Sequence, residues 1–292
     1  MNAVPPVSGK RVGVRVAVLQ RGCLLLLLAG CAGPVDLSDP TTLTSDAPSS
    51  YSDRDWATVL RENVKNGLVD YDHLAAHAEP LRQYLAMVAR FGPQTAPESF
   101  GSQWSRLGYC LNAYNAGVLA AVLHARVPAT MHEVGGPSLE SGYRLLIDGQ
   151  PLPLGDLRSA AWAESGGDAR VEFCLCDAAK GSPPLQSQPF RAESIEQDLR
   201  RVAREAMDSS SMVSVDHENE RLLMGLVIWH RRAQFLDLHR RLTGTRSPTL
   251  LSALLHMAGG VRREWLNTAV GYRVGVIPFD RSLNRWTATA SD

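Results

Sequence analysis

Hydrophobic positions recur at helical spacing along most of the chain after residue 53. Side chains three and four residues apart share one helix face, and they predict helices over residues 55–64, 81–88, 103–124, 195–207 and 249–257. The longest helix carries Asn112 and Asn115 as polar residues within an otherwise apolar stretch. We expect these two amides to form hydrogen bonds with the backbone of neighbouring segments.

Strands are predicted in the middle and at the end of the chain. Residues 143–147, the dipeptide Asp148-Gly149 and residues 151–154 together are typical of a β-hairpin. Residues 274–279 predict a last strand, whereas the apolar stretch 222–235 fits either type. We therefore expect a single α+β domain, in which several helices pack on a mostly antiparallel sheet.

Residues 170–176 (Arg-Val-Glu-Phe-Cys-Leu-Cys) alternate between polar and apolar positions. The period of two predicts a partly buried strand. Because side chains alternate between the faces of a strand, Cys174 and Cys176 would then lie on the same face.

The first thirty residues have the layout of an export signal. Basic residues precede a short apolar core, residues 22–30, and no acidic residue occurs before Asp36. A bilayer-spanning helix needs about 20 apolar residues, more than this core has. The core ends in Leu28-Ala29-Gly30-Cys31, which resembles a lipobox and predicts cleavage after Gly30 and lipidation of Cys31. An ordinary secretory signal is the alternative.

A lipidated Cys31 would anchor the mature chain in a membrane, because two or more acyl chains bind a bilayer stably. Ala32 follows the cysteine in place of aspartate. By resemblance to enterobacterial sorting, this favours an outer-membrane lipoprotein that faces the periplasm. Residues 31–52 are rich in Ser, Thr, Asp and Pro and predict a flexible tether. We therefore divide the chain into residues 1–30, 31–52 and 53–292.

Removing the signal changes the charge of the chain. The full sequence has 30 basic and 30 acidic residues, and the signal contains four basic residues and no acidic one. The mature chain therefore has a net charge near −4 and no basic stripe. This charge distribution gives no support for binding nucleic acid.

Cysteine and histidine spacing gives no metal site. Cys110, Cys174 and Cys176 remain after processing and permit at most one internal disulfide, but the second close pair of a zinc site is missing. His73 and His77 have the spacing of a zinc-binding helix, but leucine stands where the general-base glutamate should follow. We expect neither a metal nor a cofactor.

Four segments between residues 52 and 286 resemble a known family. They are Gly67-Leu68-Val69-Asp70-Tyr71, Leu111-Asn112-Ala113-Tyr114-Asn115-Ala116, Gly181-Ser182-Pro183-Pro184-Leu185 and Phe279-Asp280-Arg281-Ser282-Leu283-Asn284. In this order they resemble the domain-of-unknown-function family DUF547. The resemblance implies a structural motif made of Asn112, Tyr114, Asn115, Asp280 and Asn284. It also implies a papain- or transglutaminase-like thiol enzyme with a cysteine nucleophile and a histidine base.

The chain departs from the family pattern at the positions that this chemistry needs. The first family cysteine aligns with Asp177, the second with Ser182, and the histidine with Ser159. A thiol attacks as thiolate, and a neighbouring imidazole lowers its pKa; a carboxylate at position 177 is not activated in that way. A shift of the alignment by one residue would place Cys176 at the position of the family cysteine.

These departures favour a non-catalytic envelope lipoprotein that binds a ligand or a protein partner. We expect its degenerate pocket to be formed by Ser159, Cys176, Asp177 and Ser182. The alternative is a cysteine-dependent hydrolase or acyl transferase that uses Cys176 with His132 or His230. A purely structural role is a third interpretation. A Ser-His-Asp hydrolase has less support, because no Gly-x-Ser-x-Gly elbow occurs.

Overall fold

Helix α4 (Gln103–His124) lies at the centre of the hydrophobic core and has the predicted bounds. Ser102 and Ser105 form a capping box at its start, in which the Ser102 hydroxyl accepts a hydrogen bond from the Ser105 backbone N–H. Every residue from Leu107 to Leu119 is buried. A helix that is buried on all sides needs hydrogen-bond partners for its polar side chains. Asn112 and Asn115 must therefore find such partners inside the domain.

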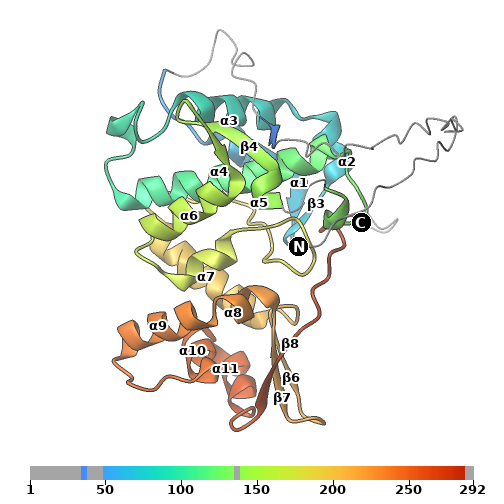
Figure 1. Ribbon diagram of the computed structural model, residues 1–292, viewed down its shortest axis with the longest axis vertical. Helices are drawn as coiled ribbons and strands as arrows, with labels where there is room; N and C mark the ends of the chain where they lie inside the picture. Colours follow the sequence, from blue (N-terminus) through green and yellow to red (C-terminus); the bar gives the residue numbers. More distant parts are fainter. Residues whose placement is uncertain (1–33, 38–48, 135–138, 287–292) are drawn as a thin grey trace, which may run out of the picture. The chain divides into compact units, whose positions relative to one another are not determined.

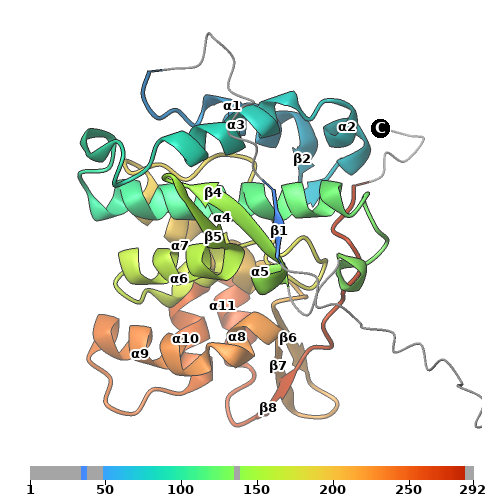
Figure 2. The same ribbon diagram turned by 45° about the horizontal axis from the view of Figure 1, so that its top comes forward.

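The other helices of the first half of the domain pack around α4 (Figures 1 and 2). Helix α1 (Arg54–Asn63) packs on α3 (Glu79–Arg90), and both α3 and α6 (Leu154–Glu164) pack on α4. The short elements of this half are α2 (Tyr71–Ala76), α5 (Leu139–Gly142) and the 3₁₀ helices η2 (Pro97–Ser99), η3 (Met131–Glu133) and η4 (Ala169–Cys174).

The strands of the described residues form three small sheets. The first is mixed and has the order β1 (Val35–Asp36), β4 (Tyr143–Ile147) and β5 (Gln150–Pro153). The second is the antiparallel pair β2 (Val64–Lys65) and β3 (Leu68–Val69). The third is mixed, with the order β6 (Val213–Asp216), β7 (Arg221–Met224) and β8 (Arg273–Val276). The α+β class is confirmed, but short separate sheets replace the expected single sheet.

The C-terminal helices accompany the third sheet (Figure 1). They are α7 (Ile195–Asp208), α8 (Leu226–His230), α9 (Arg232–Thr243), α10 (Leu250–Met257) and α11 (Gly260–Asn267). The ambiguous stretch 222–235 contains both types, because it holds most of β7, all of α8 and the start of α9. The predicted hairpin at 143–154 is confirmed by the pairing of β4 with β5. Its turn has the two positive φ angles, 52° at Asp148 and 77° at Gly149, that such turns require.

The strand predicted for residues 170–176 is wrong, since residues 169–174 form the 3₁₀ helix η4. Asp168 caps this helix through its side chain, which accepts a hydrogen bond from the Arg170 backbone N–H. The prediction failed because it placed Glu172 on the solvent face. Glu172 is only 1% exposed, and all residues from Val171 to Cys176 are buried.

The computed structural model describes residues 34–37, 49–134 and 139–286. The predicted signal and Cys31 lie outside these residues. Part of the predicted tether contacts the domain: Val35–Asp36 pairs in parallel with β4, and the Tyr51 ring lies 4.9 Å from that of Phe100. Residues 33–292 form one compact unit. Within the described part of the chain, the helices are too short or too polar to cross a membrane.

Candidate ligand-binding site

A polar cavity of about 390 Å³ is lined by residues of α5, α6, η4, α8 and the loop that follows η4. We call it the polar cavity. Its charged lining residues are Glu140, Arg158, Glu172, Asp177 and Arg231. His230, Phe279 and two aliphatic side chains of α8 complete much of the remaining wall. The cavity therefore combines five charged side chains with an apolar surface, and it is more highly charged than most small-molecule sites, which are predominantly apolar.

Arg158, on α6, is the centre of this site. One terminal nitrogen donates to Glu172 Oε2 at 2.8 Å, and the other donates to Asp177 Oδ1 at 2.7 Å. Its Nε lies 2.8 Å from Glu140 Oε1, an ion pair that lacks the geometry of a hydrogen bond. The side chain is 12% exposed, so its partners stand in for the water that burial removes. The two terminal nitrogens of the guanidinium therefore donate to protein carboxylates, whereas the Nε–H has no hydrogen-bond partner within the described part of the chain.

Tyr114 links this centre to helix α4. Its hydroxyl donates to Asp177 Oδ1 at 2.6 Å and accepts a hydrogen bond from Arg158 at 2.9 Å. Burial, followed by the nearby Asp177 charge, holds the pKa of Tyr114 well above its ordinary value. Burial lowers the pKa of Arg158, but Asp177, Tyr114 and Glu172 together raise it above its ordinary value. The tyrosine stays protonated and the guanidinium stays charged.

Glu172 is a second anchor of the site, and the sequence reasoning missed it. Its two carboxylate oxygens form ion pairs with two different arginines, Arg158 and Arg231, each at 2.8 Å. This pairing explains how a glutamate can be buried in an apolar run. An acidic residue among five apolar neighbours in residues 171–176 indicated that this carboxylate has a special role. The sequence pattern alone could not show which arginines pair with it.

The two asparagines of α4 fix the backbone that carries the site. Asn115 Nδ2 donates to Cys174 O at 2.9 Å, and its Oδ1 accepts from Cys176 N at 3.0 Å. Asn112 bonds in the same two-way manner to the backbone of Phe190, at 2.8 and 3.0 Å. The expectation that these amides bond neighbouring backbone is confirmed. Asn115 thereby sets the path of the chain immediately before Asp177.

The C-terminal tail fixes the same loop from the other side. Asn284 Oδ1 accepts a hydrogen bond from the Tyr71 hydroxyl at 2.7 Å, and its backbone N–H donates to Ala178 O at 2.8 Å. The Asp280 backbone carbonyl accepts from Gly181 N at 2.9 Å. The four segments that carry the family resemblance therefore meet around residues 177–185.

The structure brings together only part of the predicted pocket. Asp177, Ser182 and His230 line the polar cavity, whereas Ser159 and Cys176 are not among its lining residues. The Ser159 side chain is exposed, and its hydroxyl donates to Gly155 O one turn earlier at 2.9 Å. The neighbouring residue, Arg158, is the one that contacts Asp177. This places Arg158, and not Ser159, opposite Asp177.

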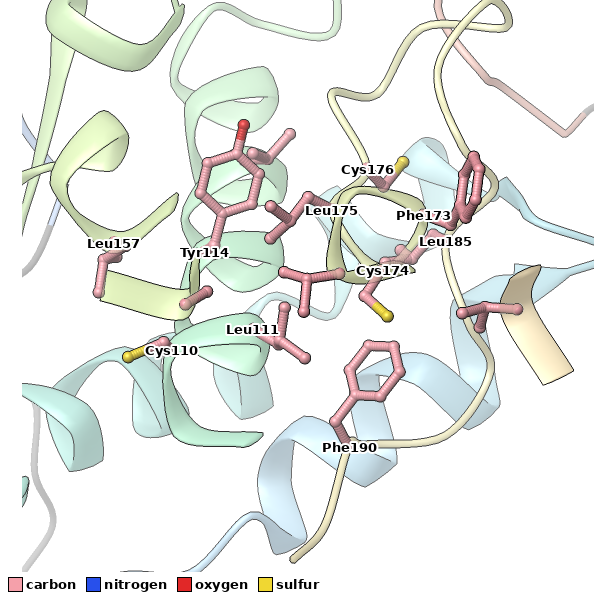
Figure 3. Packing of buried hydrophobic residues seen from close by; sticks show 14 of the residues in the cluster. Cys110, Leu111, Tyr114, Leu157, Phe173, Cys174, Leu175, Cys176, Leu185 and Phe190 are labelled. Atoms are coloured by element: carbon pink, nitrogen blue, oxygen red, sulfur yellow. The ribbon is translucent and has the colours of Figure 1, made fainter. Parts of the chain in front are cut away.

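The three cysteines that the structure describes, Cys110, Cys174 and Cys176, are free and buried. Cys176 is 3% exposed, and its Sγ lies 3.5 Å from Asn284 Nδ2 and 3.9 Å from Ser182 Oγ. Burial raises the pKa of Cys176 to about 12, and burial also raises the pKa of Cys174 and of Cys110. The sulfur atoms of Cys174 and Cys176 point in opposite directions (Figure 3), so the expectation of a shared face is wrong.

The remaining histidines add no metal site. His132 is exposed on η3. The rings of His73 and His77 stack with their centroids 4.3 Å apart, and His73 Nδ1 lies 2.8 Å from Asn63 Oδ1. Among the residues that the structure describes, no group of three or more His, Cys, Asp or Glu side chains could hold a metal ion.

Comparison with known proteins gives no family assignment. No family model matches the chain, and neither the curated proteins nor the solved structures contain a match. The resemblance to DUF547 rests on the four quoted segments and stays a prediction.

Proposed function

We propose that this protein is a DUF547-like lipoprotein of the cell envelope, anchored through Cys31, that binds a ligand in the polar cavity without catalysing a reaction. The observation that carries the proposal is the Arg158–Asp177 ion pair. Asp177 stands where the resemblance would place the cysteine, and Arg158 immediately precedes Ser159, where the resemblance would place the histidine. A guanidinium that stays charged accepts no proton, so it is no general base.

The other groups of the polar cavity are poor nucleophiles. The Ser182 hydroxyl is buried and donates to Ala179 O at 2.7 Å. Cys176 lies outside the lining, and a thiol with a pKa near 12 holds little thiolate at neutral pH. The alternative, a hydrolase or acyl transferase that uses Cys176, therefore has less support than binding.

The charges of the cavity indicate which ligands fit. Three carboxylates face two guanidiniums, and Arg158 already forms ion pairs with Glu140, Glu172 and Asp177. The side chains of Asp177 and Glu140 are 37% and 46% exposed, and that of Arg231 is 38% exposed, so two of the three most exposed charged groups are carboxylates. The cavity thus favours a ligand that donates hydrogen bonds and carries no negative charge. A neutral saccharide or another polyol meets both conditions, and the Phe279 ring offers it an apolar face.

Calorimetry with residues 32–292 tests this function. We expect saturable binding of at least one neutral oligosaccharide, and binding at least tenfold weaker for its uronate counterpart, since the cavity has a net negative charge. Asp177→Asn should weaken binding, whereas Asp156→Asn, at an exposed position of α6 outside the lining, should not. Equal binding of the neutral and the anionic sugar, or an equal effect of the two variants, would contradict the proposal.

Rebuilding the missing pair tests the assignment of the position. Asp177→Cys with Arg158→His should create a thiol that reacts with iodoacetamide at neutral pH, because imidazole then replaces the guanidinium that contacts residue 177. Asp177→Cys with Ser159→His is the matched control, since the Ser159 side chain is directed away from the cavity and should give no gain. A gain only in the control would show that the sequence alignment, and not the structural contact, identifies the histidine position.

A further inference from the structure

A second cavity, of about 300 Å³, is bounded by α7, α9 and α10 and shares no lining residue with the polar cavity. We call it the amphipathic cavity. Its apolar lining includes Phe235, Leu238, Ala253 and Met257. Leu242 also lines it and is 53% exposed. An exposed leucine at the edge of an apolar cavity extends the apolar surface that a ligand could cover.

His239 is a buried imidazole in this cavity that lacks a partner for one of its nitrogens. The residue is 9% exposed, and within the described part of the chain its Nδ1 is buried with no hydrogen-bond partner. Its ring centroid lies 5.5 Å from that of His256, which lines the same cavity. Buried polar atoms are nearly always bonded to something. Because protein atoms cover Nδ1, a ligand oxygen in the cavity reaches this unpaired nitrogen when the imidazole turns toward the cavity.

The side chains that line this cavity include more arginines than carboxylates. Arg170 pairs with Asp168 and Glu196, and Arg200 also pairs with Glu196. Arg204, one turn further along α7, lines the cavity and has no ion pair among the described residues. A cation without an ion pair and an imidazole nitrogen without a partner in the lining of the same cavity favour an anionic group on the ligand.

We propose that the amphipathic cavity binds a small amphiphile with a single carboxylate and an unbranched apolar chain. The apolar chain would lie among Phe235, Leu238 and Met257. The carboxylate would lie at Arg204 and, with the imidazole turned toward the cavity, accept a hydrogen bond from the Nδ1–H of neutral His239. The volume is at the lower end of the range of small-molecule sites, which limits the ligand to a short chain. This inference stands independently of the polar cavity.

Titration calorimetry with octanoate tests the proposal, with 1-octanol and octylammonium as ligands of the same chain length. Residues 33–292 form a compact unit with their own core, so residues 32–292 serve as the protein. We expect one octanoate per chain, binding at least tenfold weaker for 1-octanol, and no measurable binding of octylammonium. Equal affinity for the three ligands, or no binding of octanoate at millimolar concentration, would overturn the proposal.

Two variants locate the binding site. Arg204→Met should weaken octanoate binding at least tenfold and leave 1-octanol binding unchanged, whereas Arg240→Met, at an exposed residue paired with Asp237, should change neither. Ala253→Met fills the cavity from a buried position and should abolish binding of both ligands. Wild-type octanoate affinity in Arg204→Met would overturn the proposal even if Ala253→Met fails to fold.

Discussion

Replacing Asn115 by leucine removes the side chain that holds the backbone in front of Asp177. The asparagine is buried on α4 and bonds both Cys174 O and Cys176 N, at 2.9 and 3.0 Å. Leucine has a similar size but no polar atom. The substitution therefore leaves one backbone carbonyl and one backbone N–H buried without a partner, while it changes the packing little.

The expected cost follows from these two orphaned groups. An unsatisfied buried polar group costs about 1–3 kcal/mol, so Asn115→Leu should lower the free energy of unfolding by about 4 kcal/mol. For a domain of this size, each kcal/mol lowers Tm by about 2–4 °C, which gives a decrease of roughly 8–16 °C. Asn267→Leu, at an exposed position of α11, should change the stability by no more than about 0.5 kcal/mol.

Urea denaturation followed by tryptophan fluorescence and far-ultraviolet circular dichroism measures both variants. Coincidence of the two probes supports the two-state treatment that the comparison requires. A loss below about 1 kcal/mol for Asn115→Leu would refute the reasoning, because it would mean that water or a relaxed backbone satisfies both groups.

Three further outcomes are expected. Gly67→Ala should destabilise the domain by about 3 kcal/mol or more, because φ is +78° and the added Cβ would lie 2.3 Å from the Cβ of Pro184. Gly271→Ala, where φ is +87° and the added Cβ meets open space, should cost only about 1 kcal/mol. Urea titration measures both variants, and equal losses of stability would contradict the predicted clash with Pro184. Burial, followed by a neighbouring imidazole, lowers the pKa of His239. As the pH falls below the unfolded pKa of about 6.5, the unfolded chain therefore binds more protons than the folded chain, and the free energy of unfolding falls between pH 7 and pH 5. His239→Gln should reduce this dependence of stability on pH. An unchanged pH dependence in the variant would refute the role of His239. Cys31→Ser should move the full chain out of the Triton-extractable lipoprotein fraction and abolish labelling with a palmitate analogue, and persistent labelling would exclude Cys31 as the acceptor.

The sequence predicts helices well where burial and capping agree with the apolar pattern. Helix α4 has the predicted bounds because its apolar run is long and a Ser102 cap fixes the start. The hairpin at 143–154 follows from Asp148-Gly149, whose backbone angles suit a tight turn. Local chemistry determines both elements, so a local pattern suffices to find them.

The candidate site depends on contacts that local patterns do not contain. Arg158 meets Asp177 and Tyr114 across 19 and 44 residues of chain. Glu172 misled the strand prediction because two arginines, one on α6 and one in the turn between α8 and α9, allow its carboxylate to be buried. Alignment alone pointed to Ser159, although the helix directs the preceding residue, Arg158, into the cavity. Pairing partners of this kind are a property of the tertiary fold.

The pH dependence of Cys176 alkylation, resolved by mass spectrometry of residues 32–292, tests most directly whether thiol chemistry is absent from the site. An ordinary thiol titrates near 8.5, and burial raises the pKa of Cys176 to about 12. We predict alkylation that is slow in the folded protein and whose midpoint lies above 8.5. A midpoint well below that value would reveal an activated thiolate and contradict a non-catalytic function.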